Sequence, residues 1–141
     1  GHRAYVLEIN PFLPPLPVCR ALSPKGRNAV GEAMLLASAG LAAPAFQTHH
    51  AAGVGYIALP EPGVFEGIEG MERALNVEGL DEVIPFMAAG EAGVPPPAGN
   101  QRAAAVTAKA ATAEAAEKAV REALSLLTVT MSPARRTGAA V

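Results

Sequence analysis

The first residues with a chemical pattern are Glu8 and Asn10, in the run Tyr5-Val-Leu-Glu-Ile-Asn-Pro11. The run is rich in β-branched and aromatic residues, which favours a buried strand over residues 4–10 that ends at the proline. Successive side chains of a strand point to opposite faces, so Glu8 and Asn10 share one face. A carboxylate and an amide oxygen on one face suit Mg²⁺, which keeps other positions for water and phosphate oxygens.

Two interpretations of this pair stay open from the residues alone. Two side chains cannot hold a metal ion by themselves, and no partner ligand lies nearby in the sequence. In the alternative, Glu8 is an acid at a strand edge and Asn10 is a turn former before Pro11. The spacing alone does not decide between a metal site and an ordinary strand end.

Three other features have residue types found in sites but lack the required spacing. His49 and His50 are adjacent, so on a strand they point to opposite faces, and we expect them at the surface. The segment Gly67-Ile-Glu-Gly70 lacks the Lys-Ser/Thr of a phosphate loop and predicts a strand-to-helix turn. Cys19 is the single cysteine, which excludes an internal disulfide and indicates a buried thiol in a reducing, cytoplasmic setting.

The length has room for one modest domain, or for a small domain with the fringe of a larger one. Half of the 141 residues are apolar, but there is no Trp and aromatics make up 4%, so the core must use Ala, Val, Leu and Ile. A net charge of −2 with interspersed signs lacks the basic patch of a nucleic-acid binder. No apolar run approaches the roughly 20 residues of a membrane span. The chain begins without Met and reaches an expected strand almost at once, which favours a start inside a longer protein, although a processed or tagged terminus would look the same.

The N-terminal third predicts connections and one helix. The proline-rich run over residues 11–17 cannot pair inside a sheet and predicts a loop or an extended connection. Residues 29–39 combine good helix formers with apolar residues at helical spacing, and Gly40 supplies a stop signal.

Short strands and two helices are expected after residue 50. The clearest element is a helix over 113–127, with Thr112 as N-cap and an apolar stripe that includes Ala116 and Val120. Two early strands could form a hairpin, and Pro85 places a later strand at a sheet edge. The expected strands are 52–59, 64–68, 81–87, 101–109 and 128–131, with a short helix over 71–75 and a loop over 90–99. This order predicts an α+β fold, a small antiparallel sheet with helices packed on one face.

The whole chain resembles part of a known enzyme superfamily. The run with Glu8 and Asn10 is similar to the strand near the end of ATP-grasp domains, where a Glu and an Asn hold the magnesium ions that bridge the ATP phosphates. Downstream of that run, the chain resembles the C-terminal region of L-amino acid ligases, a branch of the same superfamily, so that the resemblance covers most of residues 4–131. The matching segments, in order, are Val54–Pro60, Gly63–Gly70, Gly79–Val83 and Thr112–Glu117.

The resemblance implies the C-terminal end of an ATP-dependent, Mg²⁺-requiring ligase. Such an enzyme joins a small-molecule carboxylate to an amine through an acylphosphate and forms an amide or peptide bond. Glu8 and Asn10 would hold metal and take no part in proton transfer. The lysines that hold ATP and another acidic metal ligand are expected upstream of Gly1, so we expect no turnover by this chain alone. The competing class is a non-catalytic α+β binding or assembly module.

One residue departs from the superfamily pattern. The residue after Pro11 is usually an Arg, whereas this chain has Phe12, which cannot make a charge-assisted contact to an anion. Arg20 or Lys25 could replace it, or the substrate geometry could differ, or the enzyme could be degenerate.

The resemblance also implies domain boundaries. Residues 1–22 would finish the catalytic domain, 23–45 would form a helical connector, 46–131 would form the small α+β domain and 132–141 a flexible tail. Outside a complete enzyme, the first strand would expose an edge, which leaves self-association into a homo-oligomer open.

Overall fold

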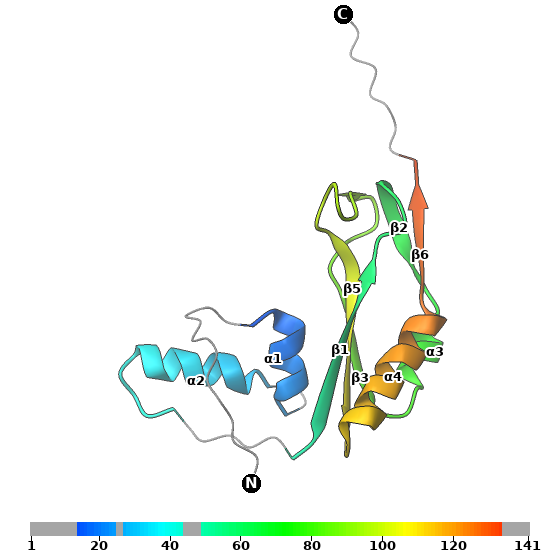
Figure 1. Ribbon diagram of the computed structural model, residues 1–141. Coiled ribbons are helices and arrows are strands. Elements are labelled where there is room, and N and C mark those ends of the chain that lie inside the picture. The colour runs from blue at the N-terminus through cyan, green and yellow to red at the C-terminus, as the bar shows by residue number, and fades with distance from the viewer. Residues whose placement is uncertain (1–13, 25–26, 44–48, 134–141) are drawn as a thin grey trace, which may run out of the picture.

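The computed structural model describes residues 14–24, 27–43 and 49–133 (Figure 1). The strand predicted for residues 4–10 lies outside the described residues, as does most of the predicted tail. The elements in chain order are α1 (Leu16–Leu22), α2 (Ala29–Ser38), β1 (Ala51–Ala58), β2 (Gly63–Glu69), α3 (Met71–Leu75), β3 (Leu80–Pro85), β4 (Ala92–Gly93), β5 (Arg102–Ala110), α4 (Ala113–Leu126) and β6 (Thr128–Ser132).

The strands of the described chain form two three-stranded sheets. The first has the order β1-β5-β3 and the second the order β4-β2-β6. Every pairing is antiparallel. Together with the helices this confirms the predicted α+β class, although the one small sheet expected from the sequence is divided into two.

The hairpin expected between the first two strands is wrong. β1 pairs with β5, with Ala51 opposite Ala110, whereas β2 pairs with β4 and β6. The turn-rich segment after β1 leads the chain from one sheet into the other. Turn residues mark where a chain changes direction, but the partner of a strand depends on which side chains bury one another.

β5 is the central strand of the first sheet and is buried from residue 103 to residue 108. Its small side chains allow elements to pack on both faces. A Cβ added to Gly55 would lie 2.6 Å from Val120 Cγ1 and 3.3 Å from Val106 Cγ2. Val106 therefore faces α4, and the absence of a side chain at Gly55 lets the helix lie close to the sheet.

α4 covers one face of the first sheet, and α3 lies beside it (Figure 1). The Thr112 side chain accepts a hydrogen bond from Ala115 N at 3.2 Å, which confirms the predicted N-cap. Ala116, Val120 and Ala123 are buried as the apolar stripe predicts. The two helices of the C-terminal domain thus share one face, as expected.

α1 packs on the opposite face of the same sheet, against β1 and β5 (Figure 1). The sequence predicted a loop or extended chain over residues 11–17, but α1 begins at Leu16. Pro17 lies in the first turn, where a backbone N–H has no partner within the helix, so the proline removes no hydrogen bond. A proline-rich run can therefore open a helix as readily as it can end one.

β3 is an edge strand and ends at Pro85, as the proline predicts. The short strand β4 lies within the stretch 90–99 that was expected to be a loop. It adds to the edge of β2 through two residue pairs.

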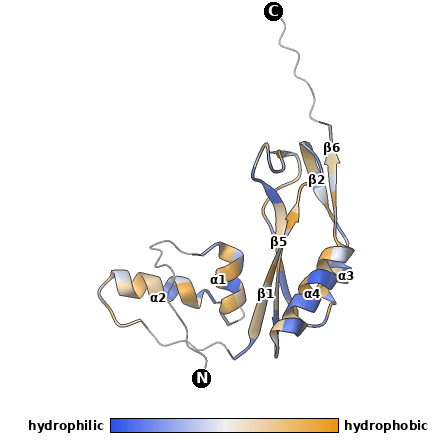
Figure 2. Cartoon of the chain, in the orientation of Figure 1, coloured by the Kyte–Doolittle hydropathy of each residue, from blue (hydrophilic) through white to orange (hydrophobic). Residues whose placement is uncertain are grey.

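α2 confirms the predicted helix but has an unusual surface. Asn28 caps it, accepting from Gly31 N at 3.0 Å, and Gly40 follows with a φ of 71°. Its apolar side chains are largely exposed, with Leu35 at 72%. Figure 2 colours much of this helix as hydrophobic. No helix in the described part of the chain is long and apolar enough to cross a membrane.

Candidate functional site

The residues predicted to bind metal, Glu8 and Asn10, lie outside the described residues, and so do Phe12 and Lys25. The first described residue is Pro14, four positions after Asn10. The nearest part of the predicted site that can be examined is therefore α1, together with the surfaces that hold it.

Small side chains fix α1 to the first sheet. Cys19 and Ala21 are 2% and 1% exposed, and they let the helix lie close to β5, whose side chains are also small. The Cys19 thiol donates a hydrogen bond to the carbonyl oxygen of Pro14 at 3.2 Å. The prediction of a buried thiol is confirmed.

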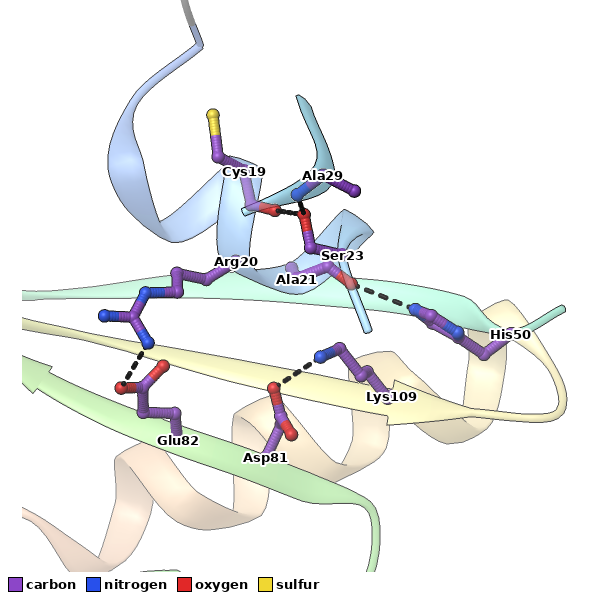
Figure 3. Close-up of polar contacts among 9 residues, drawn as sticks. All are labelled: Cys19, Arg20, Ala21, Ser23, Ala29, His50, Asp81, Glu82 and Lys109. Atoms are coloured by element: carbon purple, nitrogen blue, oxygen red, sulfur yellow. Dashed lines mark hydrogen bonds and ion pairs between the residues drawn. The ribbon is translucent and has the colours of Figure 1, made fainter. Parts of the chain in front are cut away.

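Ser23 ties the end of α1 to the start of α2 (Figure 3). Its hydroxyl is fully buried, donates to the Cys19 carbonyl oxygen at 2.6 Å and accepts from Ala29 N at 2.9 Å. Both contacts satisfy backbone groups that helix ends leave without partners. The two helices are therefore connected by hydrogen bonds as well as by the chain.

His50 ties the end of α1 to the segment that leads into β1. Its Nε2 lies 3.0 Å from the carbonyl oxygen of Ala21 (Figure 3), and because a carbonyl accepts, Nε2 is the donor. His49 is exposed, as predicted, and His50 is half-buried. The backbone of α1 provides a partner that sequence spacing does not reveal.

Two ion pairs join charged groups at the α1 face of the sheet (Figure 3). Arg20 Nη1 on α1 lies 3.4 Å from Glu82 Oε1 on β3, and Lys109 Nζ lies 2.8 Å from Asp81 Oδ2. The side chains of the first pair are 42% and 36% exposed, so it contributes on the order of 0.2–1 kcal/mol at most. Arg20 is thus held by β3 and retains further N–H groups.

An open hollow of about 570 Å³ lies beside the start of α1. Leu16 and Pro17 of α1, Tyr56 of β1, and Phe86 and Met87 after β3 supply its apolar lining. The Tyr56 and Phe86 ring centroids are 6.3 Å apart with the planes tilted by 35°. Exposed aromatic rings around a concave surface are suited to hold an apolar group.

The polar residues that line this hollow form hydrogen bonds mainly with the backbone of its own loops. Arg102 Nη1 donates to the carbonyl oxygens of Asn100 and Gln101, each at 3.3 Å. Glu91 Oε2 accepts from Ala88 N at 2.9 Å. Among its described lining residues, no nucleophile stands beside a base. Across the described ranges, no three His, Cys, Asp or Glu side chains come close enough to hold a metal ion.

This hollow could not be predicted from the sequence, because the residues that form its walls are distant in the chain. Tyr56 and Phe86 are separated in the chain by β2, α3 and β3, and the sequence places each of them in an ordinary strand. Pairing of β1 and β3 with the same strand, β5, brings them together. The exposed aromatics are a signal only after that topology is known.

Comparison with known proteins identifies this part of the fold. A family model described as L-amino acid ligase C-terminal domain 2 matches residues 55–132, which run from β1 to β6. Among solved structures, the chain is similar to the crystal structure of L-amino acid ligase from Bacillus licheniformis, with a TM-score of 0.54 and 22% identity. At that identity the likeness concerns the fold.

The match spans 63% of this chain and 22% of the Bacillus licheniformis chain. No curated protein matches the sequence. The family model covers more than half of the chain and includes both sheets and the helices α3 and α4. The chain therefore belongs to the L-amino acid ligase C-terminal domain 2 family.

Proposed function

We propose that this chain is the C-terminal part of an ATP-dependent ligase that joins a carboxylate to an amine through an acylphosphate. The observation that carries the proposal is the family match over residues 55–132, which lies downstream of a Glu-x-Asn-Pro run typical of ATP-grasp strands. The order of segments supports it as well, because the run at Glu8 and Asn10 stands directly before the element that docks on this domain.

In the complete enzyme, Glu8 and Asn10 would hold Mg²⁺. A carboxylate and an amide oxygen are the hard ligands that this ion prefers, so the donor chemistry fits. Bound with ATP, the ion would neutralise charge on the phosphate oxygens. These residues alone would not fill the coordination sphere, and lysines and further acids of the remaining enzyme would complete the site.

Within this proposal, the role of α1 is to fix the end of the metal-binding segment. Pro15 is five positions after Asn10, a span of at most about 18 Å. Cys19, Ser23 and His50 lock α1 onto the sheet and onto its neighbours. The domain would thereby set the position at which the catalytic strand leaves the active site.

The exposed apolar surface of α2 and the turn after it supports a larger enzyme around this chain. Met34, Leu35 and Leu41 are 36%, 72% and 59% exposed, which leaves an apolar segment without a cover among the described residues. A helix that is apolar on most of its surface is normally buried. We assign residues 1–22 to the catalytic domain and 23–45 to a connector, with α2 packed against that domain in the complete enzyme.

The direct test is ATP consumption by the complete enzyme. Asn10→Ala and Glu8→Gln should each abolish carboxylate-dependent ADP release, because both remove a metal ligand. Glu61→Gln is the matched control, since Glu61 is an exposed acid in the turn after β1, and it should leave ADP release unchanged. Circular dichroism should show the same fold for all three variants.

Undiminished ADP release by Asn10→Ala would contradict the metal-ligand role. An upstream coding sequence without a phosphate-covering loop, ATP-binding lysines and a further acidic ligand would favour the non-catalytic binding module instead. Phe12→Arg is informative in the same assay, because a gain of activity would show that the usual cation is needed at this position.

A further inference from the structure

The edge strands of the two sheets differ in how well they are protected against pairing with a strand of another chain. An open strand edge presents unpaired N–H and C=O groups, and natural proteins blunt such edges with charges, proline, bulges or short strands. β3 has Asp81 and Glu82, ends at Pro85 and has an irregular register after Leu80. β4 is two residues long. β6 is a five-residue strand with exposed threonines at 128 and 130.

β1 has fewer of these protecting features. It is eight residues long and reads Ala-Ala-Gly-Val-Gly-Tyr-Ile-Ala, without a charge or a proline. Its register with β5 is regular up to Ile57. In the described part of the chain, β5 is its one strand partner, and no other element makes a backbone hydrogen bond to residues 51–58. Among the described residues, its other edge is therefore a long, uncharged row of backbone groups with which a strand could pair.

α4 places a charged flank above this open edge. The helix contacts β1 through Ala116, Val120 and Leu124, which lie nearest to the positions where a Cβ on Gly53 or Gly55 would point. The opposite flank, which includes Ala115, Lys118 and Glu122, borders Gly79 and Lys109.

Helical spacing then places Glu117 and Arg121 on the β1 side of α4, further from the sheet than the residues that contact the strand. Glu117 Oε1 accepts from Arg121 Nη2 at 2.6 Å, and the two side chains are 63% and 77% exposed. An acid and a base one turn apart are self-complementary when two such helices run antiparallel.

We propose that two copies of this chain pair through antiparallel β1 strands about a two-fold axis, which joins their first sheets into one. An isologous contact of this kind places the same surface on both subunits. Val120 lies next to both Gly53 and Gly55, so an axis through Val54 passes beside the middle of α4. Glu117 of each copy then comes within reach of Arg121 of the partner subunit.

The β1 edge plays no part in the ligase assignment, so the dimer and the ligase function can fail separately. The first measurement is light scattering of the chain after size-exclusion chromatography, over a range of concentrations. The unmodified chain should give the mass of a dimer. Ala52→Lys with Ala58→Lys should raise the dissociation constant about tenfold or more, because charged lysines on an edge strand oppose its pairing with another strand.

The matched control is Ala88→Lys with Ala89→Lys, which adds the same charge away from β1 and should leave the dimer unchanged. Hydrogen exchange locates the contact independently. Amides within residues 51–58 should become more protected as the concentration rises, while those of α2 should not change. Far-ultraviolet circular dichroism confirms that each variant is folded.

A charge exchange tests the placement of the axis. Glu117→Arg and Arg121→Glu should each weaken self-association, and an equimolar mixture of the two variants should restore it as a heterodimer. A chain that is monomeric at all concentrations, or a dimer that the β1 lysines leave intact, would overturn the proposal. Loss of the dimer without rescue in the mixture would overturn the two-fold arrangement stated here.

Discussion

Gly55→Ala is the sharpest test of how α4 packs on the first sheet. Gly55 lies on β1 under the helix, and a Cβ there would approach Val120 Cγ1 to 2.6 Å and Leu124 Cδ1 to 2.9 Å. Leu124 can change rotamer, but Val120 is β-branched and restricted about χ1. The helix must therefore shift away from the sheet, or Val120 must leave its preferred rotamer.

The expected magnitude follows from two opposing terms. Overpacking of a well-filled core costs about 1–3 kcal/mol. Replacing glycine in a strand recovers about 0.5–1 kcal/mol by reducing the freedom of the unfolded chain. We expect a net loss of about 1–2 kcal/mol, equivalent to a Tm lower by roughly 5–10 °C for a domain of this size.

The assay is thermal and urea unfolding of the chain, with Gly67→Ala as the matched control. Gly67 also lies in a strand, but a Cβ there would meet nothing within 4 Å. The control should be neutral or slightly stabilising, so the difference between the variants isolates the contact with α4. A Gly55→Ala protein as stable as the control would refute the packing argument.

Three further substitutions test other parts of the fold by the same unfolding assays. Thr107→Val should stabilise the protein by about 1 kcal/mol, because the Thr107 hydroxyl is buried without a hydrogen-bond partner in the described structure; a loss of stability would show that the hydroxyl has a partner. Gly70→Ala should destabilise by about 2 kcal/mol or more, since Gly70 has a φ of 85° and an added Cβ would collide with the Leu126 carbonyl oxygen; an unchanged midpoint would contradict this. Ser23→Ala should cost about 1–3 kcal/mol by leaving Ala29 N without its buried acceptor, and hydrogen exchange should become faster at the start of α2. Equal exchange rates there would argue against the proposed link between the two helices.

The local elements of the C-terminal domain could be predicted because their signals are local. Thr112 followed by an apolar stripe is sufficient to place α4, since capping and amphipathicity act within a few residues. Pro85 at an edge strand follows in the same way from its missing N–H group. The resemblance to L-amino acid ligases also rested on such short segments, and the family match confirms it.

Strand pairing could not be predicted from the same signals. The turn after β1 predicted a hairpin with β2, but β1 pairs with β5, a strand far away in sequence that begins only at Arg102. The preference arises because β5 is buried on both faces and its small side chains accommodate α1 and α4 at once. The residue types in a turn contain no information about which distant strand β1 will pair with.

The sequence by itself determined the class of the fold, the family and the candidate metal ligands Glu8 and Asn10, whose role stays a prediction. Only the tertiary structure decided that the proline-rich run opens helix α1, that Tyr56 and Phe86 share a hollow beside it, and that β1 has β5 as its one strand partner among the described residues. The physical reason is common to all three. Residue types and spacing act along the chain, whereas burial depends on which distant surfaces cover one another, and that is settled only when the whole chain packs.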